Sequence, residues 1–215
     1  MTGSTILTMA ESLVDETIDE TIAHQLINNK INEIEAERPW NYLIGVNTSL
    51  TALSSDTYAT AKTIPTDCAT IIKIEVGERE YLPLSLEHFD DYKDIAGYYF
   101  INGSNFYLSG TVSETKTIRI TYRKFSTEIT SATSPSFPAR FHSMLAFYLA
   151  SDFYIMDAGE KNMSWHNELY TKGETLLNQM RLWDAEVTSN AINTMQAMNT
   201  NIGDGIKKYE DDVLN

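Results

Sequence analysis

One stretch of this chain, residues 98–108, decides how the rest is interpreted, and it reads YYFINGSNFYL. Aromatic and apolar side chains flank Asn102-Gly103 on both sides, and an Asn-Gly pair tolerates the positive φ angles of a two-residue hairpin turn. The stretch therefore predicts two antiparallel strands, and it places a β region in the middle of a 215-residue chain.

Strand and turn patterns extend this β region over residues 41–137. The segments TIIKIEV (70–76) and TIRITYR (117–123) alternate apolar and polar residues, as half-buried strands do. Gly77-Glu78 predicts a turn into a further strand over 79–84, and a short acidic helix is expected over 86–94. Together these patterns predict an antiparallel module of five or six strands.

Both flanks of the β region carry helical periodicity. A short helix is expected near residues 6–14, and a capping box from Thr17 to Glu20 predicts the start of a longer one. Pro39 should end that helix, because the residue before a proline is pushed out of the helical region. After the β region, Pro138 is expected as the first residue of a helix, and Ala158-Gly159 as its C-cap.

A second long helix is expected to follow that C-cap. Gly173 lies on its apolar stripe, where it predicts either close helix approach or a kink. The predicted stripes of the long helices are Ile22, Leu26, Ile27, Ile31 and Ile34; Phe141, Met144, Leu145, Tyr148, Leu149 and Met156; and Trp165, Leu169, Leu176, Leu177, Met180 and Trp183.

The order helices, β module, helices predicts an α+β fold. We expect residues 1–40 and 138–186 to form one discontinuous helical bundle, with residues 41–137 inserted as the β module. Residues 187–215 are expected to form a C-terminal arm. Val187, Ala191, Met195, Met198 and Ile202 continue a thin apolar stripe into this arm, and Gly203-Asp204-Gly205 should break its helix. So thin a stripe must fray or bury its apolar side against a partner, unless the arm is a disordered tail without a role.

Composition excludes several classes of protein. A net charge of −14 argues against gripping nucleic-acid phosphates and against docking on an anionic membrane. The lone Cys68 excludes an intrachain disulfide and any cysteine-pair metal site, and it fits a reducing compartment. The N-terminus lacks the basic region of a secretory signal, and no window approaches the ~18 apolar residues of a membrane span.

No catalytic chemistry is predicted. The four histidines are isolated in the sequence, so we interpret them as structural, and no nucleophile elbow or phosphate-binding glycine loop occurs. The acids Glu87, Asp90, Asp91 and Asp94 lack the spacing of a calcium loop and predict a solvated helix face. The aromatics of the β module could stack bases, but the module carries eight basic residues against eleven acids, which disfavours RNA. We expect no catalytic residue, no cofactor and no metal.

Several stretches of the sequence resemble one known family in the right order. LINNKINEIEAERPWNY (26–42) is similar to the first long helix of the head-to-tail adaptor proteins of tailed bacteriophages, a group that includes the tail tubular adaptor of T7-like phages. Ile64-Pro65-Thr66-Asp67 with the strand 71–76 resembles that family's strand entry. The stretches 106–108, 117–123, 137–142 and 165–183 resemble its last strands, its returning helix and its last bundle helix. The similarity spans about residues 20–185.

The resemblance implies a structural, non-enzymatic protein of the virion neck, made in the host cytoplasm. Multiple copies, a dodecamer in that family, would form a ring under the portal protein that joins the capsid to tail or neck proteins. Genomic DNA would pass through its channel without specific binding, and an acidic ring would let DNA slide. We therefore expect no measurable affinity for duplex DNA at physiological salt.

In that family the C-terminal segment docks onto the portal. The resemblance thus predicts portal or neighbour docking by Val187, Ile192, Met195, Met198, Ile202, Tyr209, Val213 and Leu214. Because their apolar stripe is thin, we expect residues 187–215 to be mobile in the free subunit and to become ordered on the portal or on a neighbouring subunit. The alternative is a cytoplasmic module that binds a peptide or another ligand on the aromatic face of the β module. An enzyme is the third and least favoured class.

Overall fold

The computed structural model describes the protein over residues 1–157 and 163–213. The fold is mixed α+β, as predicted, with five α-helices and a seven-stranded sheet among the described residues. The chain divides into two compact units, which we call the helical unit (Met1–Tyr42 with Thr127–Asn215) and the β unit (Leu43–Ser126). Each unit is described by itself.

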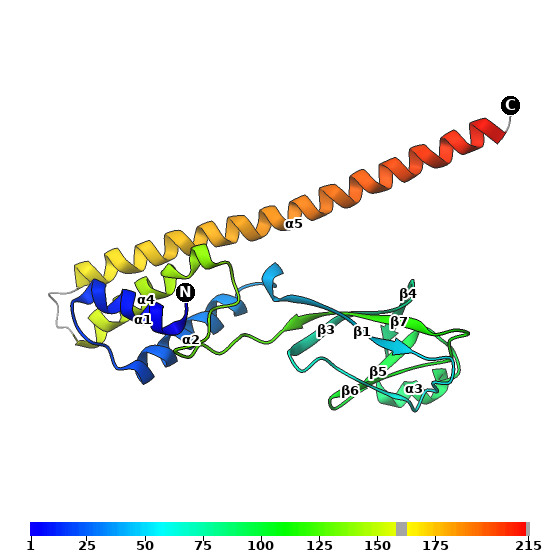
Figure 1. Cartoon of the computed structure of the whole chain (residues 1–215), viewed down its shortest axis with the longest axis horizontal. Helices are drawn as coiled ribbons and strands as arrows, with labels where there is room; N and C mark the ends of the chain where they lie inside the picture. The colour runs from blue at the N-terminus through cyan, green and yellow to red at the C-terminus, as the bar shows by residue number, and fades with distance from the viewer. Residues whose placement is uncertain (158–162, 214–215) are drawn as a thin grey trace. The chain divides into compact units, whose positions relative to one another are not determined.

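The helical unit is organised around its central helix, α4, which contacts α1, α2 and α5 (Figure 1). Its elements are α1 (Gly3–Val14), α2 (Glu20–Ala36), the short 3₁₀ helix η2 (Ala139–Phe141), α4 (Ser143–Asp157) and α5 (Met163–Val213). The described helices before and after the β region therefore pack on one another. Ala158-Gly159, the predicted C-cap of α4, lies outside the described residues.

Two predicted helix starts differ from the observed ones: the N-cap of α2 is two residues later than predicted, and α4 starts five residues after Pro138. The N-cap of α2 is Asp19, whose carboxylate accepts hydrogen bonds from the backbone of Thr21 and Ile22 at 2.9 and 3.0 Å. Aspartate caps as well as threonine does, and a cap at Asp19 buries the preceding Ile18. Pro138 likewise precedes η2 as its N-cap and is not a residue of α4.

The predicted stripes form most of the core of the helical unit. Ile27, Ile31, Leu145, Leu177 and Met180 are buried, each at most 2% exposed. Three predicted core positions are wrong, because Ile22, Met156 and Trp165 are 42%, 62% and 56% exposed. Trp165 lies in the first turn of α5, while Ile22 and Met156 flank an open hollow of about 280 Å³ at the surface between α2 and α4.

Gly173 permits close approach of α5 to α4. A Cβ atom at this position would lie 2.9 Å from two ring carbons of Tyr148, a buried residue of α4. Real Cβ atoms essentially never come so close to another heavy atom. Of the two interpretations left open for this glycine, close helix approach is therefore the one that the structure supports.

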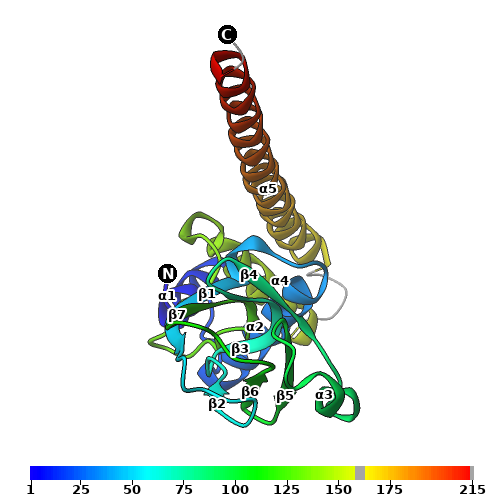
Figure 2. The same cartoon turned by 90° about the vertical axis from the view of Figure 1, so that its right-hand side faces the viewer.

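The β unit is a seven-stranded sheet in the order β1-β7-β3-β4-β5-β6-β2. Its elements, seen from a second direction in Figure 2, are η1 (Asn41–Leu43), which enters it, β1 (Ile44–Ala52), β2 (Ala61–Thr63), β3 (Cys68–Val76), β4 (Arg79–Pro83), α3 (Leu86–Tyr92), β5 (Tyr98–Asn102), β6 (Asn105–Leu108) and β7 (Lys116–Lys124). Its core gathers the inward residues of the predicted strands, among them Ile74, Phe106, Ile118 and Ile120, all 0% exposed.

Three details of the predicted module are corrected. The sheet has seven strands, where five or six were predicted. The sheet is not wholly antiparallel, because β4 and β5 pair in parallel at Leu82–Tyr98 and Pro83–Tyr99. The helical crossover through α3 brings the chain back in the same direction, as a parallel pair requires. The hairpin turn is Gly103-Ser104 rather than Asn102-Gly103, since Asn102 still pairs with Asn105. Of these three residues, only Gly103 has a positive φ, +61°.

Helix α5 does not break at Gly203-Asp204-Gly205, where a break was predicted. It runs without interruption from Met163 to Val213. Glycine costs an α-helix about 1 kcal/mol relative to alanine but forbids none of its dihedral angles, so two glycines need not end it. In both Figure 1 and Figure 2 this helix continues beyond the other helices of its unit.

Candidate interaction site

The predicted docking residues all fall on or just after the C-terminal part of α5. Val187 is 38% exposed. Ile192, Met195, Met198, Ile202, Tyr209 and Val213 fall on a part of α5 whose backbone alone is described, and Leu214 lies outside the described residues. The backbone of the predicted docking residues from Val187 to Val213 thus lies on one helix, and their docking role stays a prediction.

The last buried position of α5 within its described side chains is Asp184, and it anchors the helix. Asp184 is 1% exposed, and its Oδ1 accepts a hydrogen bond from the backbone N–H of Asn41 at 2.8 Å. The amide of Asn41 in turn donates to the Asp184 carbonyl at 3.1 Å and to the Thr188 hydroxyl at 2.6 Å. Arg38 approaches the other carboxylate oxygen at 3.3 Å.

An ion pair lies one helical turn before this anchor. Arg181 of α5 donates from two guanidinium nitrogens to the two carboxylate oxygens of Glu37, with Nε 3.0 Å from Oε2. The hydrogen bond to Glu37 raises the pKa of Arg181 above its usual value, against a smaller opposing effect of burial. Both side chains are about one-third exposed, so water screens the pair. Together with Asp184 it fixes where α5 leaves the packed helices.

Sequence reasoning missed Asp184. A signal was present, because the residue follows Leu177 and Met180 at helical steps of three and four and so continues a buried stripe with an acid. An acid in that position needs local partners, since a buried charge is costly unless it is paired and hydrogen-bonded. Its partners are about 143 residues away in the sequence, so no local pattern could name them.

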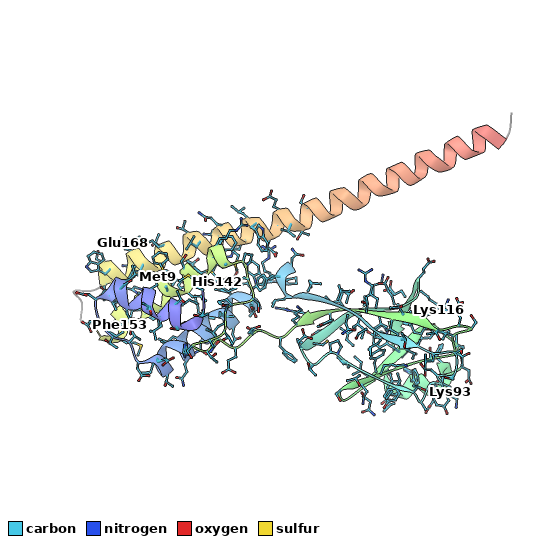
Figure 3. All side chains as sticks on the ribbon, viewed as in Figure 1. Met9, Lys93, Lys116, His142, Phe153 and Glu168 are labelled. Carbon is cyan, nitrogen blue, oxygen red and sulfur yellow. The ribbon has the colours of Figure 1, made fainter. Side chains whose placement is uncertain are left out.

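Two of the four histidines serve the packing of the helical unit. His142, labelled in Figure 3, is buried and its Nε2 lies 2.8 Å from the Phe137 carbonyl oxygen. Burial lowers the pKa of His142 below its usual value, partly offset by that hydrogen bond. His166 Nδ1 lies 2.7 Å from the Ser151 hydroxyl. His24 and His88 lie elsewhere, on α2 and on the exposed face of α3.

The described part of the chain contains no cluster of side chains that could bind a metal ion. There, no group of three or more His, Cys, Asp or Glu side chains is close enough to hold a metal ion. The acidic side chains of the α3 region point to solvent, as predicted: Glu87, Asp90, Asp91 and Asp94 are all exposed.

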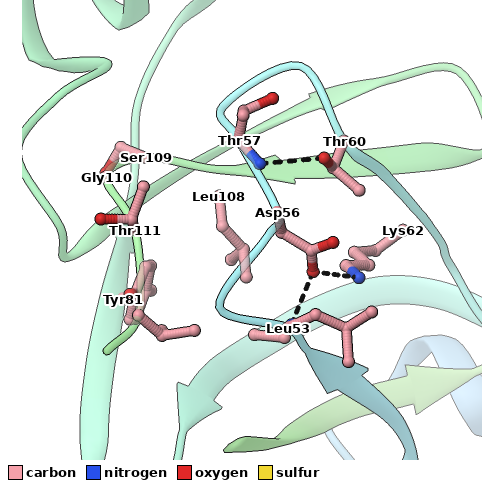
Figure 4. Close-up of a pocket in the computed structure, with 12 residues that line it drawn as sticks. Leu53, Asp56, Thr57, Thr60, Lys62, Tyr81, Leu108, Ser109, Gly110 and Thr111 are labelled. Atoms are coloured by element: carbon pink, nitrogen blue, oxygen red, sulfur yellow. Dashed lines mark hydrogen bonds and ion pairs between the residues drawn. The ribbon is translucent and has the colours of Figure 1, made fainter. Parts of the chain in front are cut away.

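A small cavity of the β unit, lined by residues between Ala52 and Val112, is too small for a ligand. Figure 4 shows this pocket beside the loop that follows β1, and its volume of about 10 Å³ is that of a single water site. The Asp56 carboxylate holds the loop by accepting from Lys62 at 2.6 Å and from the backbone of Leu53 at 2.8 Å. Burial raises the pKa of Asp56, but these two hydrogen bonds outweigh it and the net shift is downward.

Six aromatic side chains of the β unit are buried in its own packing, whereas Tyr58, Tyr92 and Phe125 are 40%, 39% and 60% exposed. Phe106, Tyr99 and Phe100 are 0%, 4% and 8% exposed. Phe100 stacks on Tyr107 with ring centroids 4.7 Å apart and packs on Phe89 of α3 at 4.3 Å. The buried rings offer little free face, so stacking of a ligand on the β unit would depend on the exposed rings.

The larger opening in the β unit is a cleft of about 750 Å³ between β3 and β5. Residues from β3, β5, the turn after β5 and the segment before β3 line it. Within the described residues, no helix is long and apolar enough to span a bilayer. The C-terminal part of α5 and this cleft are the two surfaces that we consider further for an interaction.

The sequence matches one protein family over most of its length. Residues 1–196 match the SU10 adaptor protein family, so the chain belongs to that family. This membership supports the predicted kinship with phage head-to-tail adaptors and a structural role, while likeness to the T7-type adaptor in particular stays a prediction. The match also takes in α1 and residues 187–196, which sequence reasoning had left outside the resemblance. No curated protein matches the chain.

Proposed function

We propose that the protein is a head-to-tail adaptor of a tailed bacteriophage, located in the virion neck. Multiple copies, twelve by analogy with the resembled adaptors, form a ring under the portal that joins the capsid to tail or neck proteins. The observation that carries this proposal is the family match over residues 1–196. The protein acts by holding other proteins together and not by catalysis.

The C-terminal part of α5 is the docking arm in this proposal. Asp184 and Arg181 connect α5 to residues 37–41 by a hydrogen bond and an ion pair. Residues 185–189, which follow Asp184, are all exposed. At 1.5 Å per residue, the helix from Asp184 to Val213 extends about 44 Å, which is long enough to reach a separate protein. The bundle of residues 1–40 and 138–186 supplies its rigid base, and residues 187–215 supply the contact with the portal or a neighbouring subunit.

The net charge fits the passage of DNA through such a ring. At −14 per subunit, twelve copies surround the channel with a strongly negative potential. DNA carries the same sign, so it passes the ring without the counterion release that stabilises binding.

Native mass spectrometry and negative-stain electron microscopy test the proposal, with the purified protein alone and mixed with its portal. The expected result is a closed ring, either alone or on the portal. A protein that stays monomeric with the portal present at micromolar concentration contradicts the adaptor role. A deletion of residues 190–215 serves as the matched variant, because it keeps the Asn41–Thr188 hydrogen bond and removes only the distal arm.

A further inference from the structure

The sheet of the β unit is open at one end, between β3 and β5. Strand β4 pairs with β3 only over Ile74–Val76, although β3 begins at Cys68. On its other side, β4 pairs with β5 only at Tyr98 and Tyr99. The first half of β3 and the last half of β5 therefore extend past the end of β4, with the place of a strand left between them.

The opening arises where β4 leaves the sheet. Pro83, the last residue of β4, has no backbone N–H to continue the ladder, and the chain turns away into α3. Residues 69–73 consequently pair along their β7 side alone, and residues 100–102 along their β6 side alone. Within the described residues no other strand joins their remaining edges, so both present backbone donors and acceptors for a further partner.

The cleft of about 750 Å³ lies at this opening, and its lining is uncharged. Of its thirteen lining residues none is Asp, Glu, Lys, Arg or His, in a chain where 21% of residues are charged. Apolar groups reach it from both strands, chiefly Ile71 of β3 with Tyr99 and Ile101 of β5. Ile101 is 49% exposed although it lies on the same strand face as Tyr99, which belongs to the core, so it stands beside the core but lacks a covering strand. Thr63, Thr70 and Ser104 add hydroxyl groups.

We propose that this cleft binds an extended, uncharged segment of a partner protein as an added strand between β3 and β5. Main-chain hydrogen bonds to the two free edges supply affinity, and apolar side chains at every second position of the segment cover Ile71 and Ile101. A charged side chain would be excluded, because the cleft offers it no counter-charge.

The occupant is another protein and not a second copy of this chain. Donation by a second copy requires a free extended segment, and the described connections of the chain are held down. Asp56 and Thr60 fix the loop after β1, while Asn28 exchanges two hydrogen bonds with Ile129 in the connection after β7. Val112 packs against the β core in the loop before β7.

The cleft is distinct from the proposed docking part of α5, since it belongs to a different unit and offers a different mode of contact. Binding there is also independent of ring formation, because the cleft lies within one β unit. A test on the free subunit therefore separates failure of the cleft from failure of the adaptor role.

The experiment titrates the isotope-labelled full chain with a blocked synthetic peptide of about six residues in which Thr alternates with Val. Amide NMR shifts and hydrogen exchange are followed at 69–73 and 100–102. We expect shifts and slowed exchange at both segments. Ile101→Asp should weaken binding about tenfold or more, because it places a charge on the cleft wall. Ile95→Asp is the matched control, since Ile95 is 53% exposed in the same unit and does not line the cleft.

Two further peptides define how the proposal fails. A peptide with Asp in place of each Val should not bind, and one with a central Pro should bind weakly for want of an N–H. Equal binding of either peptide, equal loss in Ile95→Asp, or no shift at 69–73 and 100–102 overturns the proposal. Concentration-dependent self-association that Ile101→Asp abolishes also overturns it, by assigning the cleft to a second copy. The folded state of each variant is checked by its dispersed amide spectrum.

Discussion

Gly173 shows how a single hydrogen atom sets the distance between two helices. Replacing it by alanine adds a methyl group 2.9 Å from the Tyr148 ring. That ring cannot move aside freely, because Tyr148 is 2% exposed and its hydroxyl donates to Glu174 at 2.7 Å. Overpacking of this kind costs about 1–3 kcal/mol, which exceeds the gain of about 1 kcal/mol from better helix propensity. We expect Gly173→Ala to lower the free energy of unfolding in urea.

The neighbouring exposed residue Gln179 supplies the control for this prediction. Gln179→Ala, on the outer face of the same helix, should change the free energy of unfolding by less than about 0.5 kcal/mol. If Gly173→Ala stabilised the protein by its helix propensity, the close approach of α4 and α5 would be refuted.

The buried imidazole of His142 should make the free energy of unfolding depend on pH. Burial lowers its pKa below 6.5 in the folded protein, so the unfolded chain takes up a proton first as the pH falls. Its contribution to stability is therefore complete above pH 6.5 and is lost as the pH falls from 6.5 through the folded pKa. Asp152, whose pKa burial raises, acts in the opposite direction at lower pH.

Urea unfolding at several pH values between about 7.5 and 5.5 tests the prediction for His142. The free energy of unfolding should fall more steeply with decreasing pH in the wild type than in His142→Gln, which cannot titrate. Parallel curves for the two proteins would show that His142 binds protons equally well in both states.

At the scale of the element, the turn of the hairpin β5–β6 allows the energetic cost of a positive φ angle to be measured separately from side-chain contacts. Gly103 has a φ of +61°, and a Cβ added there would meet no atom within 4 Å. Gly103→Ala should therefore destabilise the β unit by about 1–2 kcal/mol through backbone strain alone. Gly103→Asn should cost less, because asparagine tolerates this region. Thermal unfolding monitored by circular dichroism gives both values, and equal costs for Ala and Asn would point to a lost contact instead.

Local periodicity predicted most elements, and the errors lie where distant contacts decide. The strands 70–76 and 117–123 and the hairpin were predictable because alternation and a glycine turn are encoded within a few residues. Strands β1 and β2 were not singled out, since their polar, Thr- and Ser-rich segments become strands only by pairing with β7 and β6. The parallel pairing of β4 with β5 depends on a crossover that no local pattern reports.

The candidate sites were predictable only in part, for the same reason. The apolar residues beyond Trp183 could be recognised from their spacing, and they belong to the part of α5 that we propose as the docking arm. Asp184 could not be identified as the anchor of that arm, because Arg38 and Asn41 come close only in the folded bundle. The cleft between β3 and β5 was equally hidden, since it exists where β4 stops pairing with both strands.

At the scale of the whole molecule, the helices before and after the β unit should unfold together. Leu145 of α4 is 1% exposed, and α4 contacts α1, α2 and α5. Leu145→Ala should cost about 2–5 kcal/mol, as other buried large-to-small changes do. Hydrogen exchange should show the loss equally at Ile27 and Ile31 of α2 and at Leu177 of α5. Unchanged protection of α2 in this variant would refute a single helical bundle.

The C-terminal arm yields the prediction that bears most directly on function. Deleting residues 190–215 removes no described buried side chain, and it keeps both the Asp184 anchor and the Thr188 hydroxyl that Asn41 contacts. The melting temperature should therefore change by no more than about 2 °C, because a helical segment adds little to stability by itself. The longer deletion of residues 187–215 also removes Thr188 and should lower it slightly more. Both truncated proteins should fail to attach to portal-containing capsids in a sedimentation assay. Normal attachment by either one would exclude the deleted residues as the docking element and leave that role to another surface, such as the cleft of the β unit.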